Sequence, residues 1–201
     1  MSAWIHHLFY LVYKFCSNVT RVTTISKPEP RRVGGQRRRG TRENAGMHVS
    51  AKADYGMRAL LELAAAYAEN PQRLVKGDTI SKAQDIPLKF LEGILRQLRQ
   101  SGIVASQRGA DGGYRLDRDP KDVSIADVVR ALDGPLAAIR GQRPEDLDYT
   151  GASEHLREVW IAVRASMRHV LEHISLADVA TGTLPANVTD LLTEPGAWQR
   201  R

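Results

Sequence analysis

Apolar and polar residues follow the period of a helix most regularly just after residue 87. Leucine recurs there at spacings of three and four, at Leu88, Leu91, Leu95 and Leu98. Side chains at this spacing lie on one side of a helix, so the stretch predicts a helix with one buried face. Pro87 suits its first turn, and Gly102 suits the left-handed conformation that ends many helices.

The residues that follow predict a β-hairpin. Ile103 and Val104 begin an extended strand, and residues 114–116 return as a second strand. The segment between them, residues 108–113, contains three glycines and predicts a turn. Residues 74 and 75 are expected to form a short strand that pairs with this hairpin.

A short helix is expected upstream, over residues 79–84. Asp78 is a suitable N-cap for it, and Ile80 and Ala83 are expected to face inwards. Two helices joined by a tight turn and followed by a hairpin predict a winged helix-turn-helix, in which the second helix enters the major groove of DNA. The alternative is a plain helical hairpin with a solvated basic face, and the spacing alone does not separate the two.

A longer helix is predicted at the start of this unit. Ser50 is a suitable N-cap for a helix that extends to about residue 67, and Asn70 with Pro71 should end it. Its inward face is expected to contain Tyr55, Met57, Leu60, Leu61, Leu63, Ala64 and Tyr67.

The last third of the chain predicts a long helix over residues 153–174. Its apolar residues step by four and three, the spacing of a heptad seam: Leu156, Trp160, Val163, Met167, Val170 and Ile174. A narrow seam needs a partner, which could be the same chain or a second copy. Capping boxes at residues 124–127 and 175–178 predict a helix to about Leu132 and a short closing helix.

The predicted fold class is mainly α with a small β-hairpin wing. The winged helix-turn-helix alternative assigns residues 47–140 to a DNA-binding domain and residues 141–152 to a loop. Residues 153–182 should hold the long helix, which is a dimerisation helix where its partner is a second copy, and the closing helix. Residues 183–201 should form an irregular tail. Residues 1–46 lack periodicity and predict a disordered basic extension, unless translation starts after them.

Four segments resemble the winged-helix regulators of the Rrf-two/BadM family, which includes iron–sulfur-cluster-sensing repressors. They are YGMRALLELA, PLKFLEGILRQLRQSGIV, the wing RGADGGYRL and DVSIADVVRALDGPL. The resemblance covers about residues 47–180, and R-G-x-x-G-G-Y is its most specific motif. The run EVWIAVRASMRHVLEHISLADVA is similar to the cluster-free repressors of cysteine metabolism. The resemblance implies binding to double-stranded DNA as a homodimer, no cofactor, and a small-molecule or enzyme effector.

The positive charge of the chain is unevenly distributed. Residues 1–46 contain nine basic and two acidic residues, a net charge of +7, whereas residues 47–201 contain 20 and 21, a net of −1. Within the latter part, residues 47–121 carry +3 and residues 122–201 carry −4. DNA binding must therefore depend on a local basic patch in the first half.

Cysteine content and hydropathy limit the cellular context. Cys16 is the single cysteine, so no intramolecular disulfide can form. The apolar run over residues 8–13 is too short to span a bilayer, and the start lacks the features of a signal peptide. A cytoplasmic protein without a membrane partner is expected.

The candidate DNA contacts lie on the helix after Pro87 and on the wing. Lys89 and Arg96 can donate to phosphates or guanine, Glu92 can accept from a cytosine amino group, and Arg108 is placed to enter a minor groove. The full candidate set is Lys89, Phe90, Glu92, Arg96, Arg108, Gly109 and Gly112. Alternatively, Glu92 only favours the helix N-terminal half, Arg96 is solvated, and the glycines only shape the turn.

No catalytic motif is found, so an enzyme is not expected. His169 and His173 are four residues apart, but two histidines without a third ligand make a weak metal site, and no metal is predicted. The resembling cluster-sensing proteins use three cysteines in the loop before the dimer helix, whereas residues 141–151 contain none. The sequence thus predicts a homodimeric repressor without a cluster. The rival hypothesis is a winged-helix module that docks a partner protein.

Overall fold

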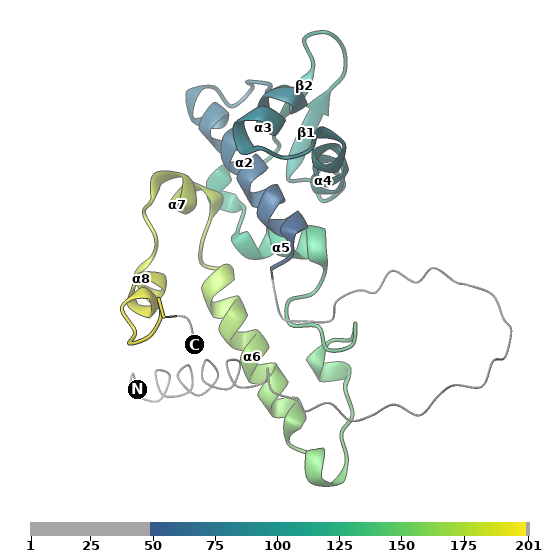
Figure 1. The fold of residues 1–201 in the computed structure, drawn as a ribbon, viewed down its shortest axis with the longest axis vertical. Helices are drawn as coiled ribbons and strands as arrows, with labels where there is room; N and C mark the ends of the chain where they lie inside the picture. The colour runs from purple at the N-terminus through teal and green to yellow at the C-terminus, as the bar shows by residue number, and fades with distance from the viewer. Residues whose placement is uncertain (1–48, 200–201) are drawn as a thin grey trace, which may run out of the picture. The chain divides into compact units, whose positions relative to one another are not determined.

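The computed structural model describes residues 49–199, and the extension predicted over residues 1–46 lies outside them. The described part is mainly helical and contains a two-stranded antiparallel hairpin (Figure 1). The predicted fold class is therefore confirmed. No helix in this part of the chain is long and apolar enough to cross a membrane.

Helix α2 (Ala51–Glu69) lies at the centre of the folded unit and contacts α3, α4, α5, α7 and β2 (Figure 1). Its predicted cap is confirmed, because the Ser50 hydroxyl accepts a hydrogen bond from the Ala53 amide at 3.0 Å. The expected inward residues Leu60, Leu63 and Ala64 are buried, and Tyr55, Met57 and Tyr67 pack partly buried against the core. Leu61 is half-buried. The face also uses small residues that the apolar spacing did not select: Ala53, Gly56, Ala59 and Ala66.

Helix α3 (Gly77–Gln84) begins earlier than predicted. Lys76 occupies the cap position and its carbonyl accepts from the Thr79 and Ile80 amides, so Asp78 lies within the first turn and is not the N-cap. An acidic side chain is still favoured there by the helix dipole. Ile80 is buried as expected, but Ala83 is exposed because the opposite side of this short helix meets the core.

The turn between α3 and α4 (Leu88–Gln100) is tight. Asp85 adopts the left-handed conformation with φ of 52°, and the Ser81 hydroxyl donates to the Ile86 carbonyl at 2.7 Å. Ile86 is buried and anchors the turn. These contacts set the direction in which α4 leaves α3.

The buried face of α4 consists of Leu91, Ile94, Leu95 and Leu98, each 1% exposed or less. Burial of such side chains contributes about 1.5–3 kcal/mol each. Leu88, predicted to be inward, is 37% exposed because it starts the helix at the rim of the core, beside Gly77.

The hairpin consists of β1 (Val104–Gln107) and β2 (Gly113–Leu116), with Val104 opposite Leu116. The strand expected at residues 74 and 75 is a single bridge, in which Val75 and Tyr114 exchange hydrogen bonds of 2.8 and 2.9 Å. This bridge ties the hairpin to the start of α3.

Helix α5 (Ile125–Asp133) and helix α7 (Leu176–Thr181) begin with the two predicted capping boxes. Short 3-10 turns lie at η1 (Pro120–Asp122), η2 (Pro144–Asp146) and η3 (Gly151–Ser153). Helix α6 (Leu156–Leu171) is shorter than the predicted span of residues 153–174.

The stretch expected to be an irregular tail contains α8 (Ala186–Leu192), in contrast to that prediction. Pro185 caps this helix rather than breaking structure, since proline is compatible with a helix start. Val188 supplies its buried contact and is 9% exposed.

Candidate nucleic-acid interface

The burial of the leucine face of α4 determines which residues point outwards. Lys89, Glu92 and Arg96 are all exposed. Among the described residues none of the three has an ion-pair partner, so their charges are available to a ligand. The structure thus brings these three predicted side chains together on one face.

A shallow concavity of about 340 Å³ lies between α4 and the hairpin. Its lining residues are Lys89, Glu92, Gly93, Arg96, Arg99, Ser106 and Tyr114. Three cations and one carboxylate give the lining an excess of positive charge. Arg99 donates to the Ser106 hydroxyl at 3.2 Å and so links α4 to β1. Both Arg96 and Arg99 are exposed, and of the two only Arg99 is held by a hydrogen bond to the hairpin.

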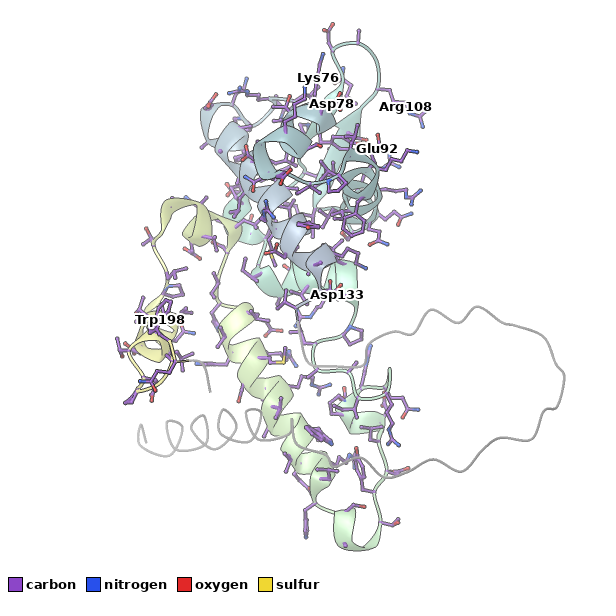
Figure 2. The ribbon with its side chains drawn as sticks, viewed as in Figure 1. Lys76, Asp78, Glu92, Arg108, Asp133 and Trp198 are labelled. Atoms are coloured by element: carbon purple, nitrogen blue, oxygen red, sulfur yellow. The ribbon has the colours of Figure 1, made fainter. Side chains whose placement is uncertain are left out.

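Arg108 follows β1 directly and is exposed. Figure 2 shows it at the foot of the hairpin turn, on the side of the unit where Glu92 also lies. Arg108 has no ion-pair partner within the described part of the chain.

The wing glycines are required by the backbone. Gly109 has φ of 109°, a conformation that side-chain-bearing residues rarely adopt. A Cβ at Gly112 would lie 2.3 Å from the Gln107 carbonyl oxygen, and one at Gly113 would lie 2.7 Å from the Val75 carbonyl oxygen. Gly109 and Gly112 thus shape the turn, whether or not they also contact DNA.

Phe90 is placed differently from the other candidates. It is 43% exposed, but its ring packs edge to face on Tyr55 at a centroid distance of 5.7 Å. The guanidinium of Arg58 lies 5.4 Å from the centre of the same Tyr55 ring, and its Nε donates to Gln84 at 3.1 Å. Phe90 therefore belongs to the junction of α2 and α4 and does not line the concavity.

Lys76 is an exposed cation that the sequence reasoning missed. It directly follows Val75, which pairs with the hairpin, and Figure 2 shows it near the wing, beside Asp78. The signal was present in the sequence, because a cation next to the strand that holds the wing must lie close to the wing.

The apolar residues of α6 are only partly covered. Val163 and, just beyond the end of α6, Ile174 are each 7% exposed, whereas Leu156, Trp160, Met167 and Val170 are half-buried. Val159, which flanks the seam, is 41% exposed. The indole Nε1 of Trp160 is buried without a hydrogen-bond partner in the described residues. The six predicted seam residues thus divide into two already packed within the chain and four half-covered.

Residues 49–199 contain no group of three or more His, Cys, Asp or Glu side chains that could hold a metal ion. His169 and His173 have ring centroids 5.5 Å apart, and Nδ1 of His173 lies 2.8 Å from the His169 carbonyl oxygen. Residues 141–151 offer no thiolate, which is the usual ligand of iron–sulfur clusters. The donor set in this part of the chain does not fit such a cluster.

Residues 49–182 match the profile of the Rrf2 family, described as "Iron-dependent Transcriptional regulator". Over 145 residues the chain is 49% identical to the HTH-type transcriptional regulator Rv1287 of Mycobacterium tuberculosis, covering 72% of this chain and 88% of the relative. It is 32% identical to the HTH-type transcriptional regulator CymR of Bacillus subtilis, covering 68% of this chain and 92% of CymR.

Two solved structures have a similar fold. The structure of CymR, the global cysteine regulator of B. subtilis, has a TM-score of 0.56 at 30% identity and aligns over 69% of this chain and 99% of its own. The structure of T. potens IscR has a TM-score of 0.54 at 34% identity, over 68% and 88% of the two chains.

Proposed function

The chain belongs to the Rrf2 family of DNA-binding helix-turn-helix transcriptional regulators, which are not enzymes, and from this premise we propose that it acts as a homodimeric repressor without an iron–sulfur cluster. In this proposal α4 enters the major groove of an operator and the hairpin reaches the adjacent minor groove. The observation that carries it is the exposed face of α4, where Lys89 and Arg96 have no ion-pair partner among the described residues.

The charge distribution supports contact with DNA rather than with a protein surface. Lys89, Arg96 and Arg108 are exposed on α4 and the wing, with Glu92 as the carboxylate of the concavity. Cations that lack an internal partner gain most from phosphate, because binding releases condensed counterions from the duplex. Glu92 then acts as a base-reading group, since a carboxylate near phosphates is repelled unless it finds a donor such as the cytosine amino group.

The homodimer is supported by the incomplete burial of α6. Leu156, Trp160 and Val170 are half-buried and Val159 is exposed, although they belong to the apolar side of the helix. A second copy of α6 would cover this side and place two recognition helices on one duplex. Val163 and Ile174 already pack within the chain. In the dimer they would hold the helix against its own chain, while the half-buried residues contact the second copy.

The cluster-free proposal rests on the ligand chemistry of residues 141–151. Cysteine thiolates are the usual protein ligands of iron–sulfur clusters, and this segment has none. The effector is then a small molecule or a partner enzyme. For the sign of regulation we propose repression, because a dimer covering an operator excludes other proteins from the same DNA.

The decisive experiment is the salt dependence of binding to duplex DNA. Fluorescence anisotropy of labelled genomic fragments, selected by the purified protein, should give affinities that fall with salt by a log–log slope of about −0.9 for each phosphate contact. Lys89→Gln should reduce that slope by about one contact. Binding to no duplex at low salt would overturn the proposal and favour docking of a partner protein.

A further inference from the structure

A second cavity, of about 410 Å³, lies between the end of α5, the loop that follows it and the middle of α6. In Figure 1 this loop runs beside α6, and η2 within it packs against that helix. Four arginines line the cavity, from three different elements: Arg130, Arg143, Arg164 and Arg168. Glu145 is the carboxylate in the lining, so its net charge is +3.

This concentration of arginine stands out against its surroundings. Residues 122–199 contain six basic residues, all arginine, and four of them line this one cavity. Residues 122–201 as a whole have a net charge of −4. The arginines are thus gathered in a region that is otherwise acidic, and like charges converge at a cost in free energy that a bound anion would offset.

Neighbouring carboxylates hold three of the four guanidinium groups in place. Arg164 is only 19% exposed and forms an ion pair with Glu145. Arg130 and Arg168 both bind the Glu172 carboxylate, the latter through Nε at 2.9 Å. Arg130 also lies 3.6 Å from Asp127. Neither Glu172 nor Asp127 lines this cavity, and counting both carboxylates leaves a net charge of +1. The cationic groups are therefore positioned in advance, which lowers the cost of ordering them around a ligand.

Arg143 is the fourth arginine of the cavity. It is exposed, and within residues 49–199 it has no ion-pair partner at 4 Å. The loop that carries it also holds two non-glycine residues in the left-handed conformation, Ala137 with φ of 52° and Arg140 with φ of 54°. Such strained conformations persist where surrounding structure enforces them, and they are frequent at ligand sites.

We propose that this cavity binds a small multivalent anion, an effector whose carboxylate or phosphate groups are recognised by the arginines. The planar guanidinium fork pairs with carboxylate and phosphate in the same bidentate geometry. Arg143 would close on the anion from the loop, while Arg164 and Arg168 bind it from α6. A bound anion would join α5 to α6 and so connect the DNA-binding unit to the dimer helix, a consequence that rests on the proposed function.

The test uses the full chain without DNA, so that its failure is separate from failure of DNA binding. Isothermal titration calorimetry is performed with citrate, inorganic phosphate and sulfate at constant ionic strength set with sodium chloride. At least one of the three should bind saturably. Arg143→Gln should weaken it about tenfold, the equivalent of one charge-assisted hydrogen bond.

A matched variant locates the site. Arg140→Gln removes the same charge from the same loop outside the cavity. It should leave the anion affinity within about twofold of the wild type, because it loses only screened long-range attraction. The proposal is overturned if none of the three anions binds saturably, or if Arg143→Gln weakens binding no more than Arg140→Gln does.

Discussion

The α-carbon of Gly56 lies directly against Leu132, where a Cβ would come within 2.3 Å of Leu132 Cδ1 and 3.4 Å of Ile94 Cγ2. This contact is where α2 crosses α5 and α4 inside the core. Gly56→Val should therefore lower the free energy of unfolding by about 1–3 kcal/mol, the usual cost of overpacking a core. Urea denaturation followed by circular dichroism measures it.

A glycine in α4 provides the control for this substitution. A Cβ at Gly93 would meet nothing within 4 Å. Gly93→Ala should raise the free energy of unfolding by about 0.5–1 kcal/mol, because alanine loses less conformational entropy in a helix. If Gly56→Val is as stable as the wild type, α2 and α5 do not cross as closely as described.

Gly56 also illustrates what apolar spacing could predict and what it could not. Leu91, Leu95 and Leu98 of α4 and the capping boxes of α5 and α7 follow from local rules, and the structure confirms them. The close crossing at Gly56 depends on residues far apart in sequence, and a glycine has no hydropathy signal. The buried face of α2 was therefore predicted at Leu60, Leu63 and Ala64. Its other small residues were missed: Ala53, Gly56, Ala59 and Ala66.

The candidate DNA-binding residues also divide into those that local spacing predicts and those that depend on contacts distant in sequence. Lys89, Glu92 and Arg96 were predicted together because the rotation of α4 is determined by its own leucines. Phe90 was also predicted to contact DNA; its 43% exposed ring packs against Tyr55, a contact between helices distant in sequence that the spacing could not predict. Likewise, the N-cap of α3 is Lys76 and not the predicted Asp78, and the pairing of Val75 with Tyr114 just before it is a long-range contact that local spacing does not show.

The wing should be sensitive to a single methyl group at Gly113. A Cβ there would clash with the backbone of Val75, which cannot move without breaking its two hydrogen bonds to Tyr114. Gly113→Ala should destabilise the fold by about 1–3 kcal/mol, the net value of two hydrogen bonds, and weaken DNA binding. Ala110→Ser at the exposed turn is the control and should change neither quantity. Wild-type stability of Gly113→Ala would mean that the Val75–Tyr114 bridge leaves room for a Cβ at residue 113.

Lowering the pH should weaken the two ion pairs that link Arg130 of α5 to Arg168 of α6, because both depend on the Glu172 carboxylate. Hydrogen bonds from Arg130, and then from Arg168, hold the pKa of this carboxyl below its usual value. A lowered pKa in the folded state stabilises the fold at pH above the ordinary glutamate value, about 4.3, and the stabilisation is lost as pH falls through the folded pKa.

Glu172→Gln should consequently be less stable than the wild type at pH 7, and the difference in unfolding free energy should shrink below about pH 4. Urea denaturation at several pH values measures both proteins. A difference that stays constant over this range would mean that Glu172 contributes through packing and not through its charge.

The proposed dimer is tested by a charged substitution in α6 at a side chain that is not buried within its own chain. Val163 is buried within its own chain, so a charge there would unfold the monomer as well. Val159 is 41% exposed, and Val159→Glu should weaken the dimer by on the order of 3 kcal/mol if the seam buries an unpaired charge. Light scattering after gel filtration measures the mass. Ala165→Glu, an exposed position on the opposite side of α6, should remain dimeric.

Sequence specificity should divide between Glu92 on α4 and Arg108 on the wing. Glu92→Ala removes a carboxylate that has no protein partner in the described chain. It should lower the ratio of specific to non-specific affinity by about 1–3 kcal/mol, the value of one base contact, while total affinity changes less because repulsion from phosphates is also removed.

Arg108→Ala should behave differently, because an arginine in a minor groove gains from the negative potential of narrow A·T tracts. Overall affinity should fall, and base preference should flatten only at positions flanking the α4 contacts. Binding-site selection on both variants at one salt concentration, with circular dichroism to confirm folding, measures this. Arg140→Gln serves as the charge control, since it lies on the loop after α5. Identical selected sequences for the wild type and both variants would mean that neither side chain contacts bases, and docking of a partner protein would then explain the exposed face of α4 better.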